Sequence, residues 1–510
     1  MTKRISIIFC LMILLGSCTK DFQKINVDPN KPSTVPIDYL LGESQLMVAG
    51  SNDAGGKSWR PNIANAACII QQMASTDAGF YGGNFYTSAS NTFTAYFDSA
   101  YPNDIKSLVN LINQAQADPK NVNVLSMARI LKVMDFEKIT DLYGDVPYSE
   151  AGRAFLDNNF TPKYDAQKDI YADMLKELDQ AAVALSPTAY IPTKADYIYS
   201  GDVAKWKRAA YTIMLRLALR LQKIDPASAA TWSAKAVAGG IIASNDETIA
   251  IRYDNTGAQL NSNPNSWIFN PSGQNVSAVN GALWSKTLID MMLSRKDPRL
   301  NIISALKGGD TTTAKQLGLP NATDANGLTK LPVTVLDNYS RPSTPMIALA
   351  NSWIFMSYAE AKLLLAEAIE RGYVTTGGLA ADAFKDGQLS ALKQVSIYGL
   401  TPSAAGMANY AAKNPYPAAG TIDDKMKAIH TEIFLLDAAT FNHIEAWANW
   451  RRSGYPVLVN LNPVGNETNG TIPRRLKYPT SEYGVNPNIT TAISRQGADL
   501  FTTRVWWDKQ

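Results

Sequence analysis

The side chains best suited to chemistry in this 510-residue chain are aromatic rings and amides in two uncharged stretches, residues 78–97 and 255–285. Aromatic planes can pack against the C–H faces of a sugar ring, and amides can hydrogen-bond its hydroxyls. Loops of this length are uncommon in compact domains unless they are functional or disordered, and aromatic content argues against disorder. The composition therefore suits a neutral, polar, ring-shaped ligand.

We expect two ligand-binding loops, at about 78–101 and 255–285, inserted into the body of the protein. The candidate ligand contacts are the aromatic and amide side chains Tyr81, Asn84, Phe85, Tyr86, Asn265, Trp267 and Trp284. The alternative is that these aromatic side chains only pin long loops to the body.

Catalytic chemistry has weaker support. Asp141 and Asp145 are the nearest pair of carboxylates that could serve glycoside hydrolysis, which needs two acids about 5 to 10 Å apart. Both occupy positions where carboxylates cap helices and turns. His430 and His443, the two histidines of the chain, lie in apolar helical contexts and are interpreted as structural. We predict no catalytic residue, no metal ligand and no cofactor.

The stretch from Leu125 to Ala151 must position this carboxylate pair. Apolar residues recur at three- and four-residue steps, which predicts a long helix. Gly144 can close a helix, and Pro147 bars its continuation and favours an extended Val146. The result is a rigid turn carrying Asp141, Tyr143, Asp145 and Tyr148, for which a purely structural role is the simplest interpretation.

Helical patterns dominate the remaining chain. Asp202 is expected to cap a helix over 202–224, and Asp225-Pro226 to end it and start another. Apolar faces predict further helices at 37–50, 61–76, 102–117, 122–143, 165–185, 353–371 and 380–394. The last two look like an antiparallel pair of the tetratricopeptide kind. The fold class is therefore mostly α, with a strand at 248–253; an irregular helical bundle is the alternative.

The N-terminal residues predict a targeting signal. Lys3 and Arg4 precede an apolar run that is too short to span a bilayer, and Leu15-Gly16-Ser17 leads directly to Cys18. We expect cleavage after residue 17, a lipid on Cys18, and a leash over 18–36 ahead of a single body at 37–510. Cys10 would leave with the signal, so Cys68 would be a lone buried thiol.

Charge excludes one class of partner. Lys and Arg total 48, and Asp and Glu total 45, which gives a net charge of +3. No basic stripe is visible, so no nucleic-acid partner is expected.

Three motifs carry a family resemblance. They are Asp141-Leu-Tyr-Gly-Asp-Val-Pro-Tyr-Ser-Glu-Ala151, Trp447-Ala-Asn-Trp-Arg-Arg-Ser-Gly-Tyr-Pro456 and Ile472-Pro-Arg-Arg-Leu-Lys-Tyr-Pro479. With the lipoprotein signal, they resemble the SusD/RagB-like nutrient-binding outer-membrane lipoproteins of Bacteroidetes. Arg451, Arg452, Arg474 and Arg475 within these motifs are interpreted as fold-closing ion pairs, with an anion site as the alternative.

The resemblance implies tetratricopeptide-like helix pairs that support an irregular, loop-rich ligand-binding lobe. It implies a lipid-anchored, surface-exposed protein of the outer membrane. Such a protein would capture an oligosaccharide, or in some members a peptide, and deliver it to a SusC-like TonB-dependent transporter. It would catalyse nothing, and Asp141, Tyr143, Gly144, Asp145, Pro147 and Tyr148 would be structural. The rival classes are a surface glycosidase and a helical adapter that binds only protein.

Overall fold

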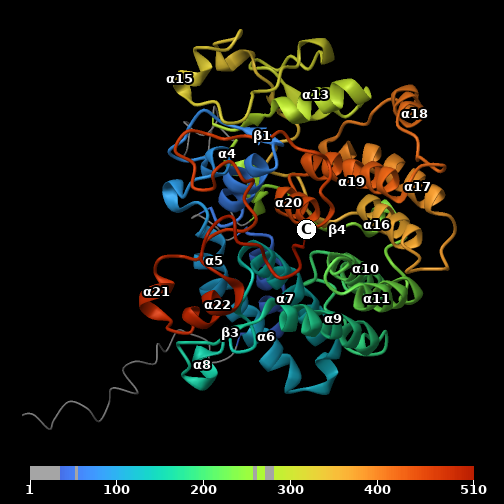
Figure 1. Ribbon diagram of the computed structural model, residues 1–510. Coiled ribbons are helices and arrows are strands. Elements are labelled where there is room, and N and C mark those ends of the chain that lie inside the picture. The colour runs from blue at the N-terminus through green and yellow to red at the C-terminus, as the bar shows by residue number, and fades with distance from the viewer. Residues whose placement is uncertain (1–34, 52–55, 257–260, 270–280, 510) are drawn as a thin grey trace, which may run out of the picture.

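A computed structural model shows two series of packed helices and several short strand pairs (Figure 1). The structure describes residues 35–51, 56–256, 261–269 and 281–509. The predicted signal, Cys18 and almost all of the predicted leash lie outside the described residues, and so do two parts of the second aromatic stretch, 257–260 and 270–280. The division into signal, leash and single body stays a prediction.

Each helix of the first series packs against the next one along the chain. These helices are α3 (Ile37–Val48), α6 (Lys106–Gln116), α7 (Val122–Tyr143), α9 (Gln167–Ala184), α10 (Val203–Arg220) and α11 (Pro226–Gly239). The side chain of Asp202 caps α10 by accepting a hydrogen bond from Lys205 N (3.0 Å), and Asp225 caps α11 through Ser228 N (3.0 Å). The predicted cap at Asp202 is confirmed, and so is the helix start at Asp225-Pro226.

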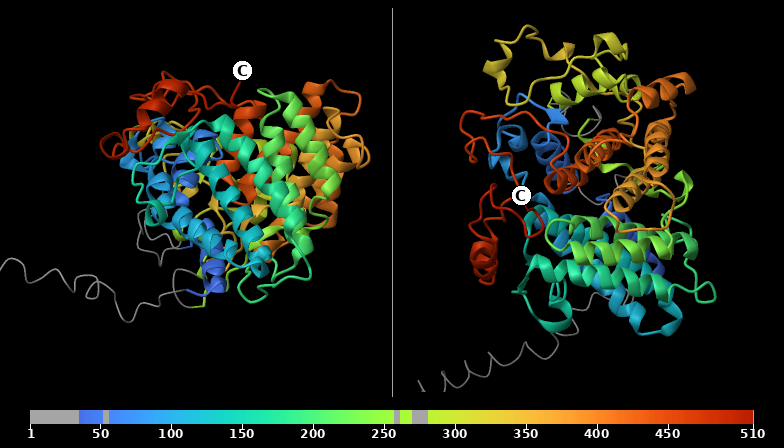
Figure 2. Two further views of the ribbon diagram at one scale, coloured as in Figure 1. Left: turned by 90° about the horizontal axis from the view of Figure 1, so that it is seen from below. Right: turned by 45° about the vertical axis from the view of Figure 1, so that its right-hand side comes forward.

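The second series contains α16 (Tyr358–Glu370), α17 (Ala380–Gln394), α19 (Ile422–Ala439) and α20 (His443–Ser453). Helices α16 and α17 pack closely, as predicted: a Cβ at Gly387 would lie 2.8 Å from Leu363 Cγ. Helix α16 also contacts α10 and α11, and α20 contacts α7, so these contacts join the two series. Figure 2 shows the series from two further sides.

Within the described ranges, four antiparallel strand pairs connect separate segments of the chain. They are β1 (Met73–Ala74) with β5 (Leu283–Trp284), β2 (Val146–Pro147) with β3 (Tyr164–Asp165), β4 (Ile249–Ile251) with β8 (Trp353–Met356), and β6 (Ser304–Ala305) with β7 (Arg341–Pro342). Strand β4 confirms the strand expected at 248–253.

Two predicted helices have different bounds in the structure. The segment Trp353–Met356 was expected to begin a helix, but it pairs with β4, and α16 begins only after Ser357, whose Oγ accepts a hydrogen bond from Glu360 N (3.2 Å). The helix expected over 61–76 is also shorter. The π-helix η1 spans Arg60–Ala67, and Gln71 turns the chain with φ +56° before β1.

Shorter elements complete the described part of the chain. The short α-helices are α4 (Gly82–Phe85), α5 (Ala95–Ala100), α8 (Ala154–Asp157), α12 (Pro264–Trp267), α13 (Lys286–Arg295), α14 (Leu300–Ile303), α15 (Ala325–Leu328), α18 (Ala404–Lys413), α21 (Glu482–Val485) and α22 (Ile489–Gln496). The remaining turns of helix are η2 (Ala89–Asn91), η3 (Tyr101–Ile105), η4 (Pro119–Asn121), η5 (Asn245–Glu247), η8 (Thr313–Lys315), η9 (Leu336–Asn338) and η10 (Val395–Tyr398).

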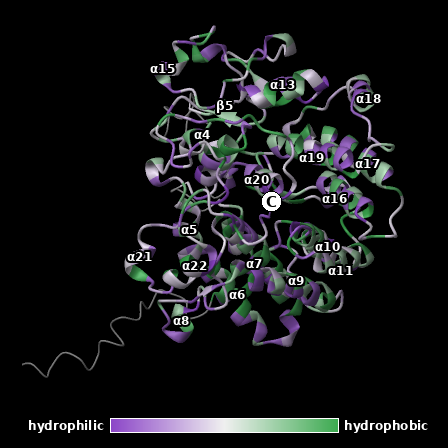
Figure 3. Ribbon diagram, in the orientation of Figure 1, coloured by the Kyte–Doolittle hydropathy of each residue, from purple (hydrophilic) through white to green (hydrophobic). Residues whose placement is uncertain are grey.

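One large hydrophobic core runs through both series and contains Cys68, which is buried as predicted. Figure 3 shows apolar and polar residues mixed along the helices. No helix among the described residues is long and apolar enough to cross a membrane. The predicted fold class is confirmed: the protein is mostly α, and packed helix pairs form its framework.

Candidate functional site

The turn that follows α7 is fixed by the C-terminal part of the chain. Gly144 has φ +86°, and a side chain there would collide with the amide of Gln496, so the position requires glycine. The N–H of Asp145 donates to Gln496 Oε1 (2.8 Å), and Pro147 lies in β2. The predicted helix stop is confirmed, and its geometry depends on contacts far along the chain.

The two carboxylates of this turn are buried and occupied by protein donors. Asp141 Oδ1 accepts a hydrogen bond from Trp507 Nε1 (2.8 Å). Asp145 Oδ1 accepts from Gln167 N (2.8 Å), and its Oδ2 accepts from Arg495 Nε (2.6 Å). Burial raises the pKa of both carboxyl groups. Neither group faces an open site, so this pair gives no support to the glycosidase alternative.

The two tyrosines of the turn also serve packing. Tyr143 donates its hydroxyl to the carbonyl of Phe93 (2.6 Å), and Tyr148 donates to Asp173 Oδ2 (2.6 Å). Both rings are buried. These contacts favour the structural interpretation of the motif.

Three of the four motif arginines form ion pairs within the protein. The pairs are Arg452 with Glu367, Arg474 with Asp508, and Arg475 with Asp499. Arg451 Nη1 instead donates to the carbonyls of Asp141 (2.7 Å) and Arg474 (2.8 Å), and its guanidinium lies over two Trp rings. The contacts favour a fold-closing role over an anion site, because the arginines are engaged by the chain itself.

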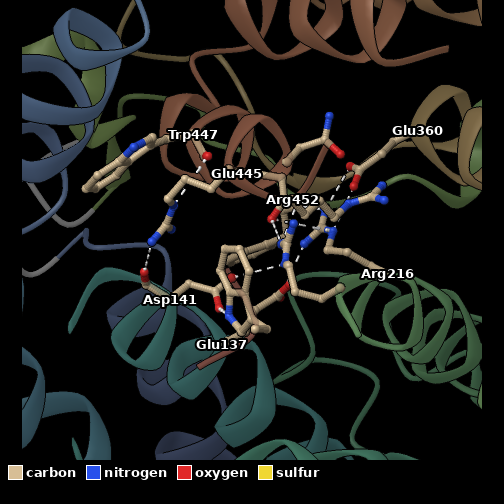
Figure 4. A network of polar contacts seen from close by, with 12 residues as sticks. Glu137, Asp141, Arg216, Glu360, Glu445, Trp447 and Arg452 are labelled. Carbon is tan, nitrogen blue, oxygen red and sulfur yellow. Dashed lines mark hydrogen bonds and ion pairs between the residues drawn. The ribbon is translucent and has the colours of Figure 1, made fainter. Parts of the chain in front are cut away.

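A buried network of charges joins the two helix series, and sequence reasoning missed it (Figure 4). Arg216 pairs with Glu360 (Nε–Oε1, 2.7 Å), and Arg220 pairs with Glu445 (Nη2–Oε2, 2.7 Å). Glu137 lies near both guanidinium groups, at 3.3 and 3.5 Å. The side chains come from α10, α16, α20 and α7. A helical period marks such positions as buried, but it does not show which distant charge will meet them.

Burial and pairing act against each other in this network. Burial raises the pKa of Glu137 and Glu360 because it disfavours the charged carboxylate. Burial acts the same way on Glu445, but the guanidinium groups of Arg220 and Arg216 outweigh it and lower the pKa of that carboxyl. The network holds helices of the two series together.

Both histidines are buried, as expected for structural residues. Burial lowers the pKa of His430 and of His443 to about 3, so both are neutral at pH 7. His443 Nδ1 lies 2.5 Å from Gln72 Oε1. Within the described ranges, no group of three or more His, Cys, Asp and Glu side chains could hold a metal ion.

Most of the predicted ligand contacts are buried. The side chains with almost no exposed surface are Tyr81, Asn84, Phe85, Tyr86, Asn265 and Trp284. Trp284 is stacked near Phe441, with ring centroids 6.2 Å apart. Trp267 is the exception, because it is partly exposed and donates its Nε1–H to Ser262 Oγ (2.8 Å). The structure thus favours the pinning role for the six buried residues, and their role as ligand contacts stays a prediction.

The structure does bring the two aromatic stretches together. Strand β1 leads into the first stretch and pairs with β5 at the end of the second, with Met73 opposite Trp284. Asn321 Nδ2 ties this junction by donating to the Met73 carbonyl (2.7 Å) and to Asn84 Oδ1 (2.8 Å). The start of the first stretch and the end of the second therefore lie side by side, and the role of the two predicted loops in ligand binding stays a prediction.

A partly exposed rim borders this junction. Phe80 stacks on Trp59, with ring centroids 5.5 Å apart, and the Arg60 guanidinium lies over the Trp59 ring. Phe80 and Arg60 are partly exposed, whereas Trp59 is buried. Sequence reasoning missed Trp59 and Arg60 because they lie outside the uncharged stretches.

Among the grooves of the described surface, two have aromatic walls and lie away from the β1–β5 junction. The acidic groove, of about 620 Å³, joins the end of the first aromatic stretch to the motif turn and α21; its walls include Phe97, Tyr101, Phe155 and Phe160, and its charged residues are Asp98, Lys106, Glu150 and Glu482. The tyrosine groove, of about 650 Å³, is lined by segments 36–39, 118–121 and 190–197 with Tyr197. No sequence pattern links these segments.

Packed helix pairs that enclose a buried charge network place the protein in the helical-repeat class of folds. The chain belongs to the SusD-like family, whose model, described as "Starch-binding associating with outer membrane", matches residues 29–479. The family resemblance expected from the motifs is confirmed. Members of this family are binding proteins rather than enzymes.

Solved structures agree over nearly the whole chain. A chitin-binding protein is 31% identical, with a TM-score of 0.81, and the match covers 93% of this chain and 100% of that one. A SusD homologue from Bacteroides uniformis is 25% identical, with a TM-score of 0.76, covering 92% and 100%. A chitin-binding SusD homologue from Flavobacterium johnsoniae is 24% identical, with a TM-score of 0.76, covering 92% and 99%. No sequence among the curated proteins matches the chain.

Proposed function

We propose that this protein captures an oligosaccharide of the chitin type, a chain of β-linked N-acetylglucosamine units, at a bacterial surface. The observation that carries the proposal is the 31% identity, over almost the full length, to a solved chitin-binding protein. The sequence motifs predict an oligosaccharide, and the proposal specifies a chitin-type one. The family implies that the protein captures this sugar without cleaving it.

The joined aromatic stretches supply the proposed site. Trp267 and Phe80 are the partly exposed rings of the two stretches, and a ring face is what a pyranose needs. The buried residues, such as Tyr81 and Trp284, would hold the surface in shape without touching the sugar. The uncharged composition of both stretches suits a neutral glycan.

Titration calorimetry tests this proposal. Purified full-length protein, in a detergent without a sugar headgroup, would be titrated with chitohexaose, maltohexaose and a mixture of short peptides. We expect heat of binding with chitohexaose, and affinity at this surface about a hundredfold weaker after Trp267→Ala, below the range that the titration detects. Trp232→Ala is the matched control, because Trp232 is also partly exposed but lies on α11.

Each other outcome has a definite meaning. Binding of maltohexaose alone would show that the ligand is a starch-type sugar and not a chitin-type sugar. Binding of peptides alone would show that the ligand is a peptide. New reducing ends during incubation would show a glycosidase. Equal affinities of Trp267→Ala and Trp232→Ala would show that the sugar does not contact Trp267.

Anchoring and delivery complete the proposal. A lipid on Cys18 would tether the protein to the outer membrane, facing outward, and a SusC-like TonB-dependent transporter would receive the glycan. The family's described association with the outer membrane supports this arrangement. Expression with the native signal should place the wild type in the outer-membrane fraction, and Cys18→Ser should release it. A Cys18→Ser protein that stays in that fraction would contradict the lipid anchor.

A further inference from the structure

Three tyrosines stand exposed around the tyrosine groove. Tyr39 is 73% exposed, Tyr190 is 44% exposed and Tyr197 is 47% exposed. They come from the start of α3 and from the loop between α9 and α10, which the fold brings to one groove of about 650 Å³. Large exposed aromatic surfaces are rare on proteins without a binding role. Their gathering at one concavity therefore points to a ligand.

Two of these rings are held in place by the protein. The hydroxyl of Tyr190 donates to Asp38 Oδ2 (2.6 Å). The ring of Tyr197 lies against Gly42 of α3, where an added Cβ would be 3.0 Å from Tyr197 Cε2. The backbone N–H of Tyr197 donates to Gln45 Oε1 (2.7 Å). Rings fixed in advance lose little conformational entropy on binding, which is the property of a prepared site.

The charges of the groove balance. Two carboxylates, Asp38 and Asp118, face two lysines, Lys120 and Lys194. The acidic groove has three carboxylates and one lysine among its lining residues, so it suits a cation better than a neutral ligand. Balanced charge, ring faces and hydrogen-bonding groups suit a neutral polyhydroxy ligand.

Polar groups also line the groove. The carboxylate of Asp38 accepts the hydroxyl of Tyr190, and the amide of Asn121 belongs to the same lining. An amide can hydrogen-bond the hydroxyls of a sugar.

We propose that the tyrosine groove is a second glycan-binding site, separate from the surface formed by the aromatic stretches. It takes a neutral oligosaccharide, with the pyranose rings stacked on Tyr39 and Tyr197. The choice of a chitin-type sugar rests on the proposed function above. Two sites on one body would hold a long glycan at two points, which strengthens binding of long chains over short ones.

Calorimetric stoichiometry with chitohexaose tests the second site. Wild-type full-length protein would be compared with Trp267→Ala, with the pair Tyr39→Ala and Tyr197→Ala, and with all three changes combined. We expect about two sugars per wild-type protein, about one for either partial variant, and none for the combined variant. Tyr39→Ala alone serves as a milder version, because this side chain is the most exposed of the three. Tyr483→Ala is the matched control, since Tyr483 is 49% exposed but lies on α21.

The outcomes separate the two proposals. Unchanged stoichiometry in the tyrosine variant, with loss in Trp267→Ala, overturns the second site and leaves the proposed function standing. Loss in the tyrosine variant alone supports the groove and overturns the Trp267 site. Absence of any chitohexaose binding to the wild type overturns both proposals for this sugar.

A membrane surface is the alternative occupant. Flotation with vesicles of phosphatidylethanolamine and phosphatidylglycerol would be measured for the wild type and the tyrosine variant. We expect equal flotation, because the groove carries no net positive charge. Weaker flotation of the tyrosine variant, combined with unchanged sugar binding, overturns the glycan site in favour of a membrane contact.

Discussion

The buried charge network and the tyrosine groove use polar groups in opposite ways. In the network, Arg216 and Arg220 meet Glu360 and Glu445 within 2.7 Å, and all four side chains are buried. In the groove, three tyrosine rings are exposed. The network pairs its charges with one another inside the protein, and the groove presents aromatic rings to solvent.

This difference separates structural roles from binding roles. A charge that is buried and paired stabilises one arrangement of helices, and removing one partner leaves the other uncompensated. A fixed, exposed ring contributes little to folding and can contribute much to binding. Substitutions in the network should therefore change stability without changing sugar affinity, and substitutions in the groove should do the reverse.

The largest expected effect is a fall in the free energy of unfolding when Arg220 is replaced. Arg220→Met leaves Glu445 and Asp141 buried without their guanidinium partner, so we expect a loss of about 3 to 5 kcal/mol in the free energy of unfolding. Urea unfolding followed by circular dichroism measures it.

The matched control for Arg220→Met is an exposed pair. Arg153 pairs with Asp157, and both side chains are about two-fifths exposed, at 41% and 42%. Arg153→Met should change stability by less than about 1 kcal/mol. Similar losses in the two variants would contradict the distinction between the buried network and surface pairs.

The helix ends were predictable because their signals are local. Asp202 and Asp225-Pro226 act through contacts three residues away, and Gly144 and Pro147 act through their own dihedral angles. The start of α16 was not predictable in this way. The run Trp353–Met356 is apolar enough for a helix or a strand, and pairing with β4, about one hundred residues earlier in the chain, decides for the strand.

Candidate binding residues were harder to predict than elements. Composition marks Tyr81 and Trp284 as aromatic, but the stacking of Trp284 with Phe441 and the burial of Tyr81 arise only in the folded chain. The tyrosine groove has no sequence signal, because its three segments lie far apart along the chain. Exposure depends on which distant surfaces come to cover a residue, and a single sequence does not contain that information locally.

The second-largest effect is expected when the pH is changed. It should alter the free energy of unfolding and leave sugar affinity unchanged. An unfolded histidine binds a proton below about pH 6.5, whereas folded His443 does so only below about 3. Between these values the unfolded state binds the extra proton, so His443 makes the protein less stable as the pH falls. Buried carboxyl groups with raised pKa values, such as Glu137, act in the opposite direction.

Comparison with His443→Gln isolates the histidine from these carboxyl groups. The unfolding free energy of the wild type, relative to this variant, should fall by about 2 kcal/mol between pH 6.5 and 5. Urea unfolding at four pH values measures the difference. A difference that stays constant with pH would show that His443 takes up a proton equally in both states. Affinity for chitohexaose should be the same in both proteins at each pH.

The smallest effect is expected from Gly42→Ala, which moves a ring without removing it. The new Cβ would lie 3.0 Å from Tyr197 Cε2, so the half-exposed ring must shift by a few tenths of an ångström. Alanine also favours the helix by about 1 kcal/mol, which offsets the crowding, so stability should change by less than about 1 kcal/mol. We expect about threefold weaker chitohexaose binding at the tyrosine groove, measured by calorimetry in the Trp267→Ala background.

Gly484→Ala is the control, since α21 has open space at that position. Equal affinity for both variants would mean that the position of the Tyr197 ring does not matter, and that the groove binds sugar without the prepared geometry argued for it.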